Sequence, residues 1–138
     1  AVNEKRNKFA SCSYFVLEIF EYSPTLSDIP KLCFRKQLDK YEYDYKTGDR
    51  ISAKMRKETS GLASVDVVSG ENYLYILTQD SNNKRNRNIM ILDWNGNPIK
   101  LLKSNKRIIC FDIDENKGKG YAIINDPEDK LVMFNLNL

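Results

Sequence analysis

Apolar residues along the chain gather in short segments that are separated by polar turns. β-branched and aromatic residues dominate these segments, and none shows a sustained apolar stripe at the 3.6-residue period of a helix. Short strands spaced about ten residues apart are typical of all-β domains. We therefore predict strands at residues 15–22, 31–38, 62–68, 73–78, 89–94, 99–102, 108–113, 120–124 and 131–136. Residues 53–58 could instead form a helical turn.

One turn has a recognisable chemistry. Asn95 and Gly96 lie between two predicted strands, and both residue types accept a positive φ. A type I′ turn requires a positive φ at both central residues and joins antiparallel strands. We therefore expect residues 89–94 and 99–102 to pair as a β-hairpin closed by such a turn.

The strand pattern repeats along the sequence. Residues 64–80 align with residues 110–126 at an offset of 46, and the next strand aligns at an offset of 42, which brings Ile91 onto Met133. The matched pairs of the first alignment include Asp66 with Asp112, Tyr75 with Tyr121, Leu77 with Ile123 and Asp80 with Asp126. As repeated residues, these carboxylates are expected to serve turns and packing within each unit rather than one shared site.

A period of about 40–50 residues with four strands in each unit is the sequence signature of a β-propeller. Residues 1–138 are thus expected to form a single β-propeller segment of about 2.5 antiparallel four-stranded blades. In this reading 15–38 supply strands C and D of one blade, 62–102 a complete blade, and 108–136 strands A, B and C of the last blade. The alternative is a β-sandwich whose hairpins merely look alike.

Three segments give the chain a resemblance to a known family. Residues 89–100 form a strand–turn–strand around Asp-Trp-Asn-Gly-Asn-Pro, residues 111–116 and 121–128 follow, and residues 38–44 look like a linker between blades. Together they resemble the TolB-like six-bladed β-propeller lipoproteins of Gram-negative bacteria, from about residue 13 to the end. The resemblance implies the propeller fold and a location in the bacterial cell envelope, in the periplasm or at the outer membrane. It carries over no catalytic residues, and the small number of strands suggests the C-terminal portion of a longer protein.

The residue inventory argues against several kinds of chemistry. The chain has no histidine, so it lacks Ser-His-Asp and Cys-His nucleophilic sites and histidine-ligated metals. Cys12, Cys33 and Cys110 have no zinc spacing. They form either one disulfide with a spare thiol or small buried apolar positions, and burial is favoured for Cys33 and Cys110. The acidic run at 112–115 lacks the spacing of a calcium loop. We expect no metal and no cofactor.

Net charge and hydropathy limit the kinds of partner that we expect. The net charge of +3 is milder than nucleic-acid-binding domains usually carry, so no nucleic acid is expected. The apolar runs are far shorter than the ~20 residues of a membrane-spanning helix. A lipid anchor in a missing N-terminal part would be compatible with the resemblance. Trp94, Phe111 and Phe134 are expected to pack between blades.

The loops that a propeller would place on one face are long and basic. These loops are residues 39–61, 79–88, 103–107 and 125–130, whereas the loops of the other face are short. Binding residues often lie on long loops held by a rigid scaffold, and tyrosine and arginine are favoured at binding hot spots. The alternative is ordinary solvated loop charge. The candidate binding residues are Tyr41, Tyr43, Tyr45, Lys84, Arg85, Arg87, Lys106 and Arg107.

These observations lead to one main functional hypothesis and two alternatives. The main one is a binding or scaffold module of the bacterial envelope that presents its long-loop face to a protein or glycan partner. The first alternative is a lyase or hydrolase in the propeller channel, whose catalytic groups would lie in missing blades. The second is a partial propeller that completes its ring by self-association.

Overall fold

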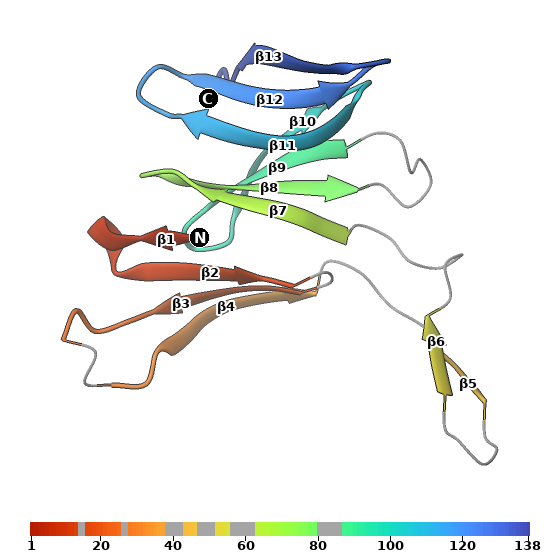
Figure 1. Cartoon of the computed structure of the whole chain (residues 1–138). Helices are drawn as coiled ribbons and strands as arrows, with labels where there is room; N and C mark the ends of the chain where they lie inside the picture. Colours follow the sequence, from red (N-terminus) through yellow and green to blue (C-terminus); the bar gives the residue numbers. More distant parts are fainter. Residues whose placement is uncertain (14–15, 26–27, 38–42, 47–51, 56–62, 80–86) are drawn as a thin grey trace.

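The computed structural model describes residues 1–13, 16–25, 28–37, 43–46, 52–55, 63–79 and 87–138. Within these ranges the chain is built from β-strands and one short 3₁₀ helix, and all paired strands are antiparallel. Sheets of four, four and three strands follow one another along the chain and stack face to face (Figure 1). The predicted all-β, antiparallel fold class is confirmed.

The first sheet has the strand order β1-β2-β3-β4. Its strands are β1 (Val2–Asn3), β2 (Lys8–Cys12), β3 (Val16–Glu21) and β4 (Lys31–Gln37), and the 3₁₀ helix η1 (Glu4–Arg6) joins the first two. The sequence pattern did not predict β1 and β2. Val2–Asn3 is too short to show alternation, and the inward positions of β2 carry only the small residues Ala10 and Cys12.

The second and third sheets follow the same order along the chain. The second sheet contains β7 (Ala63–Ser69), β8 (Tyr73–Gln79), β9 (Arg87–Asp93) and β10 (Pro98–Lys103). The third sheet contains β11 (Arg107–Asp114), β12 (Lys119–Asn125) and β13 (Asp129–Asn135). Each strand pairs with its neighbour in sequence, so both sheets are simple meanders.

A separate two-stranded sheet consists of β5 (Tyr43–Lys46) and β6 (Ser52–Met55). The helical turn suggested for residues 53–58 is therefore wrong for its described part. Residues 53–55 instead pair with Tyr43–Tyr45 in an antiparallel ladder.

The second sheet is buried on both faces because it lies between the other two. Its strand β8 carries five consecutive buried residues, from Leu74 to Thr78. Side chains of a strand alternate between the two faces, so such a run requires cover on both sides. The core between the first and second sheets comprises Ala10, Leu17, Ile19, Leu74, Ile76, Leu92 and Trp94. The core between the second and third comprises Tyr75, Leu77, Ile89, Ile91, Ile108, Phe111, Ala122 and Leu136.

The predicted aromatic core positions are found at these interfaces. Trp94 is 1% exposed and packs between the first and second sheets, where its indole N–H donates to the backbone oxygen of Gly70 at 3.2 Å. Phe111 is buried, and Phe134 packs partly buried against the second interface.

The hairpin between β9 and β10 forms as predicted, but its turn is of a different type. Only Gly96 has a positive φ, at +88°, and its N–H donates to the oxygen of Asp93 at 3.0 Å. This arrangement is a type I turn followed by a glycine bulge, which places Asn95 at a central turn position without a positive φ. The carboxylate of Asp93 fixes this geometry, because it accepts from the N–H groups of Asn95 and Asn97 at 2.8 and 2.9 Å.

The predicted equivalence of Asp66 and Asp112 is also wrong. Tyr75 pairs with Val68 across the second sheet, whereas Tyr121 pairs with Asp112 across the third. If the two tyrosines are superposed, Val68 rather than Asp66 takes the place of Asp112. The shift arises because the two turns differ in length. Two residues separate the bonded residues Gly70 and Tyr73, whereas four separate the paired residues Asp114 and Lys119.

The expectation that Cys33 and Cys110 are buried is wrong as well. Both thiols are exposed, and they form no disulfide with each other. Cys33 lies on β4 and Cys110 on the outward face of the third sheet, so neither apolar run is covered on the side that carries its cysteine.

Candidate functional site

The predicted binding residues fall in different parts of the chain. Tyr41, Lys84 and Arg85 lie outside the described residues. Tyr43 and Tyr45 lie on β5, and Arg87 is the first residue of β9. Lys106 and Arg107 lie at the junction of β10 and β11, and these two are the predicted residues that the structure shows side by side.

Lys106 is committed to a partner within its own sheet. Its ammonium forms an ion pair with the carboxylate of Asp126, which lies between β12 and β13, and the hydrogen bond from Lys106 lowers the pKa of Asp126. The backbone of the loop is held as well, since the N–H of Lys106 donates to the hydroxyl of Ser104 at 3.0 Å. Arg107 is exposed. The described part of the predicted basic face therefore offers less unpaired positive charge than the sequence suggested.

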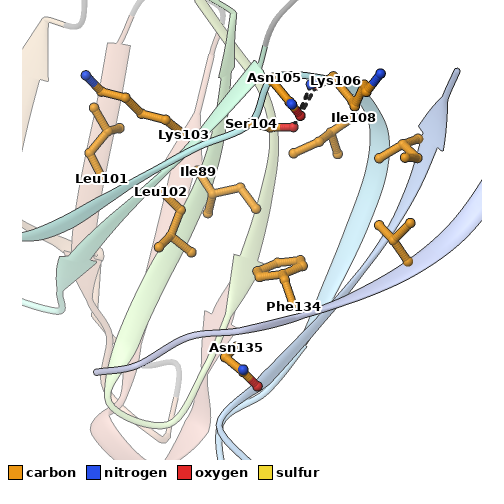
Figure 2. Close-up of a pocket in the computed structure, with 12 residues that line it drawn as sticks. Ile89, Leu101, Leu102, Lys103, Ser104, Asn105, Lys106, Ile108, Phe134 and Asn135 are labelled. Atoms are coloured by element: carbon orange, nitrogen blue, oxygen red, sulfur yellow. Dashed lines mark hydrogen bonds between the residues drawn. The ribbon is translucent and has the colours of Figure 1, made fainter.

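A groove of about 460 Å³ opens beside this junction, between β10 and the third sheet. Its apolar lining comprises Ile89, Leu101, Leu102, Ile108, Ile124, Val132 and Phe134. Its polar rim comprises Lys103, Ser104, Asn105, Lys106 and Asn135. Figure 2 shows Leu102, Ile89 and Phe134 grouped in the interior, while the ammonium of Lys103 points away from them.

Local sequence explains the shape of the groove. Gly120 has no side chain, so the ring of Phe134 lies across it, and a Cβ at Gly120 would stand 2.1 Å from that ring. Beyond β13 the chain turns inward, because Leu136 is 1% exposed in the core and its N–H donates to the oxygen of Gly118. Lys100 secures this turn by donating to the backbone oxygens of Leu136 and Asn137 at 3.0 and 2.7 Å.

The groove lies along an open edge of the third sheet. Among the described residues, β13 pairs with β12 alone, whereas β3 and β9 each have a fourth strand beside them. The N–H of Leu136 donates to the oxygen of Gly118, and along an antiparallel strand the backbone groups of successive residues point alternately toward and away from the paired strand. The N–H and C=O of Leu131 and Met133 therefore point away from β12. No described group is hydrogen-bonded to these edge groups. An edge of this kind is a template for an added strand.

A second hollow, of about 470 Å³, lies at the opposite ends of the sheets and is acidic. Its lining includes Glu71, Asp112, Asp114 and Glu115. No group of three or more described residues there is placed to hold a metal ion. Glu115 instead joins two sheets by accepting from Tyr75 Oη and from the N–H of Tyr73, both at 3.0 Å.

The neighbouring polar contacts join the first sheet to the second. The side-chain amide of Asn3 donates to the oxygens of Gly70 and Glu71 at 3.2 and 2.9 Å, and Lys8 Nζ donates to the oxygen of Trp94 at 3.1 Å. Sequence reasoning missed Asn3, Lys8 and Glu115 because their partners lie about 40 to 90 residues away. The one available signal was their position in or beside tight turns.

No helix in the described part of the chain is long and apolar enough to cross a membrane. Comparisons with protein-family models, with curated proteins and with solved structures found no match.

Proposed function

We propose that the chain is a non-catalytic binding module built from β-propeller blades, and that it binds an extended peptide segment of a partner protein at the open edge of β13. The observation that carries the proposal is the unpaired edge of a three-stranded sheet beside an apolar groove. An added strand would satisfy the backbone groups of Leu131 and Met133. Recognition by strand addition draws its affinity from such main-chain bonds and its specificity from pockets for alternate side chains.

The first two sheets indicate which side chains the bound strand should carry. At the corresponding place the first sheet has β4 and the second has β10, and each sends an apolar residue toward the neighbouring sheet. In β4 this residue is Phe34, and in β10 it is Leu102; both pack against an inter-sheet core. A ligand with apolar residues at alternate positions would place them in the groove against Leu102 and Phe134.

The side chains around the groove support a binding role over a catalytic one. The titratable side chains among the described residues that line it are Lys103, whose ammonium points away from the interior, and Lys106, which is ion-paired with Asp126. General acid–base or nucleophilic catalysis needs an available titratable or nucleophilic group within hydrogen-bond reach of the substrate. Ser104 carries the one hydroxyl among the described lining residues, and it is bonded to the backbone of Lys106.

The propeller assignment itself belongs to this proposal. It is supported by meander sheets of three and four strands that stack in chain order, and by the resemblance to TolB-like propeller lipoproteins. A cell-envelope location follows from that resemblance alone. The long loops remain a proposed second surface for a protein or glycan partner, on which Lys103 and Arg107 are exposed.

A fluorescence anisotropy titration with one defined peptide tests the edge site. The probe is a fluorescein-labelled peptide with the sequence of residues 97–104, which contains β10 and thus mimics a fourth strand. We expect saturable binding with a Kd on the order of 10–100 µM. Substituting Ser for Leu102 in the peptide should weaken binding, because one apolar contact with the groove is lost.

A pair of variants at Met133 supplies the control. Met133→Pro removes the outward-facing N–H of the edge and should abolish binding, since proline cannot donate a ladder bond. Met133→Val keeps the N–H and should bind like the wild type. Absence of saturable binding, or equal binding by both variants, would contradict strand addition at β13.

A further inference from the structure

The three sheets are stacked in one repeated direction, and the pairing ladders show it. In each sheet we count the residue pairs between the second and third strands from the end at which the second strand begins. The third pair from that end is equivalent from sheet to sheet. This pair is Ala10–Ile19 in the first sheet and Tyr75–Ile91 in the second. Ala10 and Ile19 pack against the second sheet, and Tyr75 and Ile91 pack against the third. The same face of each sheet therefore covers the sheet that follows it.

In the third sheet the corresponding face has no cover among the described residues. The third pair of its ladder is Tyr121–Met133, and the fifth is Ile123–Leu131. Leu131 is 75% exposed, Met133 59% and Ile123 38%, whereas the equivalent pair of the second sheet, Leu77–Ile89, is at most 2% exposed. We call the residues Tyr121, Ile123, Leu131 and Met133 the third-sheet outer face. Contiguous apolar residues of this kind mark an interaction surface.

The first sheet exposes the complementary face at the other end of the stack. The second pair of its ladder is Phe9–Phe20, whose rings stack at 4.9 Å with an interplanar angle of 12°. Val2 and Leu32 flank this pair in the same sheet and are 56% and 45% exposed. We call Val2, Phe9, Phe20 and Leu32 the first-sheet outer face.

The equivalents of Phe9–Phe20 show what this face is built to contact. In the second sheet the corresponding pair is Leu74–Leu92, and both residues are buried against the first sheet. In the third sheet the corresponding pair is Gly120–Phe134, on the side that packs against the second sheet. Each such pair meets the sheet that precedes it in the stack, and the first sheet has no described predecessor.

We propose that a second copy of this chain docks its first-sheet outer face on the third-sheet outer face. The contact would continue the two sheet-to-sheet interfaces that the chain already forms, with the same faces in the same roles. It is a head-to-tail contact, because two different surfaces meet, and such contacts close into rings when the rotation permits. It uses a face of the third sheet and leaves the edge of β13 to the peptide proposed above. The two proposals are therefore independent.

Sedimentation equilibrium of the full chain from 1 to 200 µM tests the proposal. We expect the weight-average mass to rise from 16.0 kDa to at least twice that value. Leu131→Asp on the third-sheet outer face and Leu32→Glu on the first-sheet outer face should each prevent the rise. Ile29→Glu is the matched control, because Ile29 is 93% exposed and lies outside both faces. Far-UV circular dichroism confirms that each variant is folded.

Mixing the two variants distinguishes a head-to-tail contact from other modes. Leu131→Asp chains retain an intact first-sheet outer face, and Leu32→Glu chains retain an intact third-sheet outer face. An equimolar mixture should therefore form a heterodimer although neither variant associates alone. A wild-type chain that stays monomeric at 200 µM overturns the proposal. Association that survives Leu32→Glu, or a mixture that stays monomeric, overturns it as well.

Discussion

The hydroxyl of Tyr75 in the second sheet donates a 3.0 Å hydrogen bond to the carboxylate of Glu115 in the turn between β11 and β12. The same carboxylate accepts from the backbone N–H groups of Asn72 and Tyr73 at 2.9 and 3.0 Å. The side-chain amide of Asn72 also donates to it at 3.4 Å, so one side chain accepts from four donors, of which those of Tyr73 and Tyr75 are partly buried. Buried donors that lose their acceptor carry the full cost of desolvation, so this contact should matter for stability.

Removing Glu115 should therefore cost more than removing the hydroxyl of Tyr75. Tyr75→Phe loses one hydrogen bond and should lower the free energy of unfolding by about 1 kcal/mol. Glu115→Ala leaves the partly buried N–H of Tyr73 and hydroxyl of Tyr75 without their acceptor and should lower it by roughly 2–3 kcal/mol. Urea unfolding measures both values, with the exposed Glu128→Ala as control. Equal effects of Glu115→Ala and Glu128→Ala would show that the second and third sheets are not joined in this way.

The same tyrosine should make stability depend on alkaline pH. Burial, and then the charge of Glu115, raises the pKa of Tyr75 above its usual value of about 10. Above that pH the unfolded chain loses this proton while the folded chain keeps it, so the unfolding free energy falls as pH rises. The stabilisation is fully present below pH ~10. Unfolding measured from pH 8 to 11.5 should fall less steeply in Tyr75→Phe than in the wild type, and identical slopes would contradict the assignment.

Two glycines with positive φ form a matched pair for mutagenesis. Gly96 has a φ of +88°, and a Cβ there would stand 2.4 Å from the ring of Phe34. Gly118 has a φ of +62° and nothing within 4 Å of such a Cβ. Gly118→Ala should cost about 1 kcal/mol of backbone strain, and Gly96→Ala roughly 2–4 kcal/mol, because it also crowds the contact between the first and second sheets. Thermal unfolding compares them, and equal melting temperatures would argue against the packing of Phe34 on this turn.

The long-loop hypothesis has its own charge test. Reversing Lys84, Arg85 and Arg87 to Glu should weaken capture of an acidic protein or glycan partner and reduce the salt dependence of binding. Pull-down at two salt concentrations measures this. Reversal of the exposed Lys31, Arg35 and Lys36 on β4 is the charge-matched control. An unchanged set of captured partners would contradict a binding role for these loops.

Periodicity was enough to predict most strands because their inward positions carry large apolar residues. The runs around Ile19, Ile76 and Ile91 are examples, and all three residues are buried. Strand β2 was not predicted because the residues at its inward positions, Ala10 and Cys12, are small and lie among polar residues. The turn at Asn95 was predicted in place but not in type, since the carboxylate of Asp93, outside the dipeptide, selects the geometry.

Most of the candidate site could not be predicted from the sequence. The groove depends on how β10 and β13 are placed, and this follows from long-range contacts such as that between Lys100 and Leu136. Of the described residues proposed from loop composition, Lys106 is the one that lines the groove, and its charge is paired with Asp126. Loop length and charge thus indicated the neighbourhood of the site but not its apolar interior.

Residue-level amide hydrogen exchange is the most direct test of strand addition at β13. In the free chain the N–H groups of Leu131 and Met133 should exchange rapidly, whereas the N–H of Val132, which faces β12, should be protected. Adding the peptide of residues 97–104 at saturating concentration should slow exchange at Leu131 and Met133 at least tenfold, since an added strand would bond to them. Unchanged exchange at these two amides, or protection that appears elsewhere instead, would contradict binding at the edge of β13.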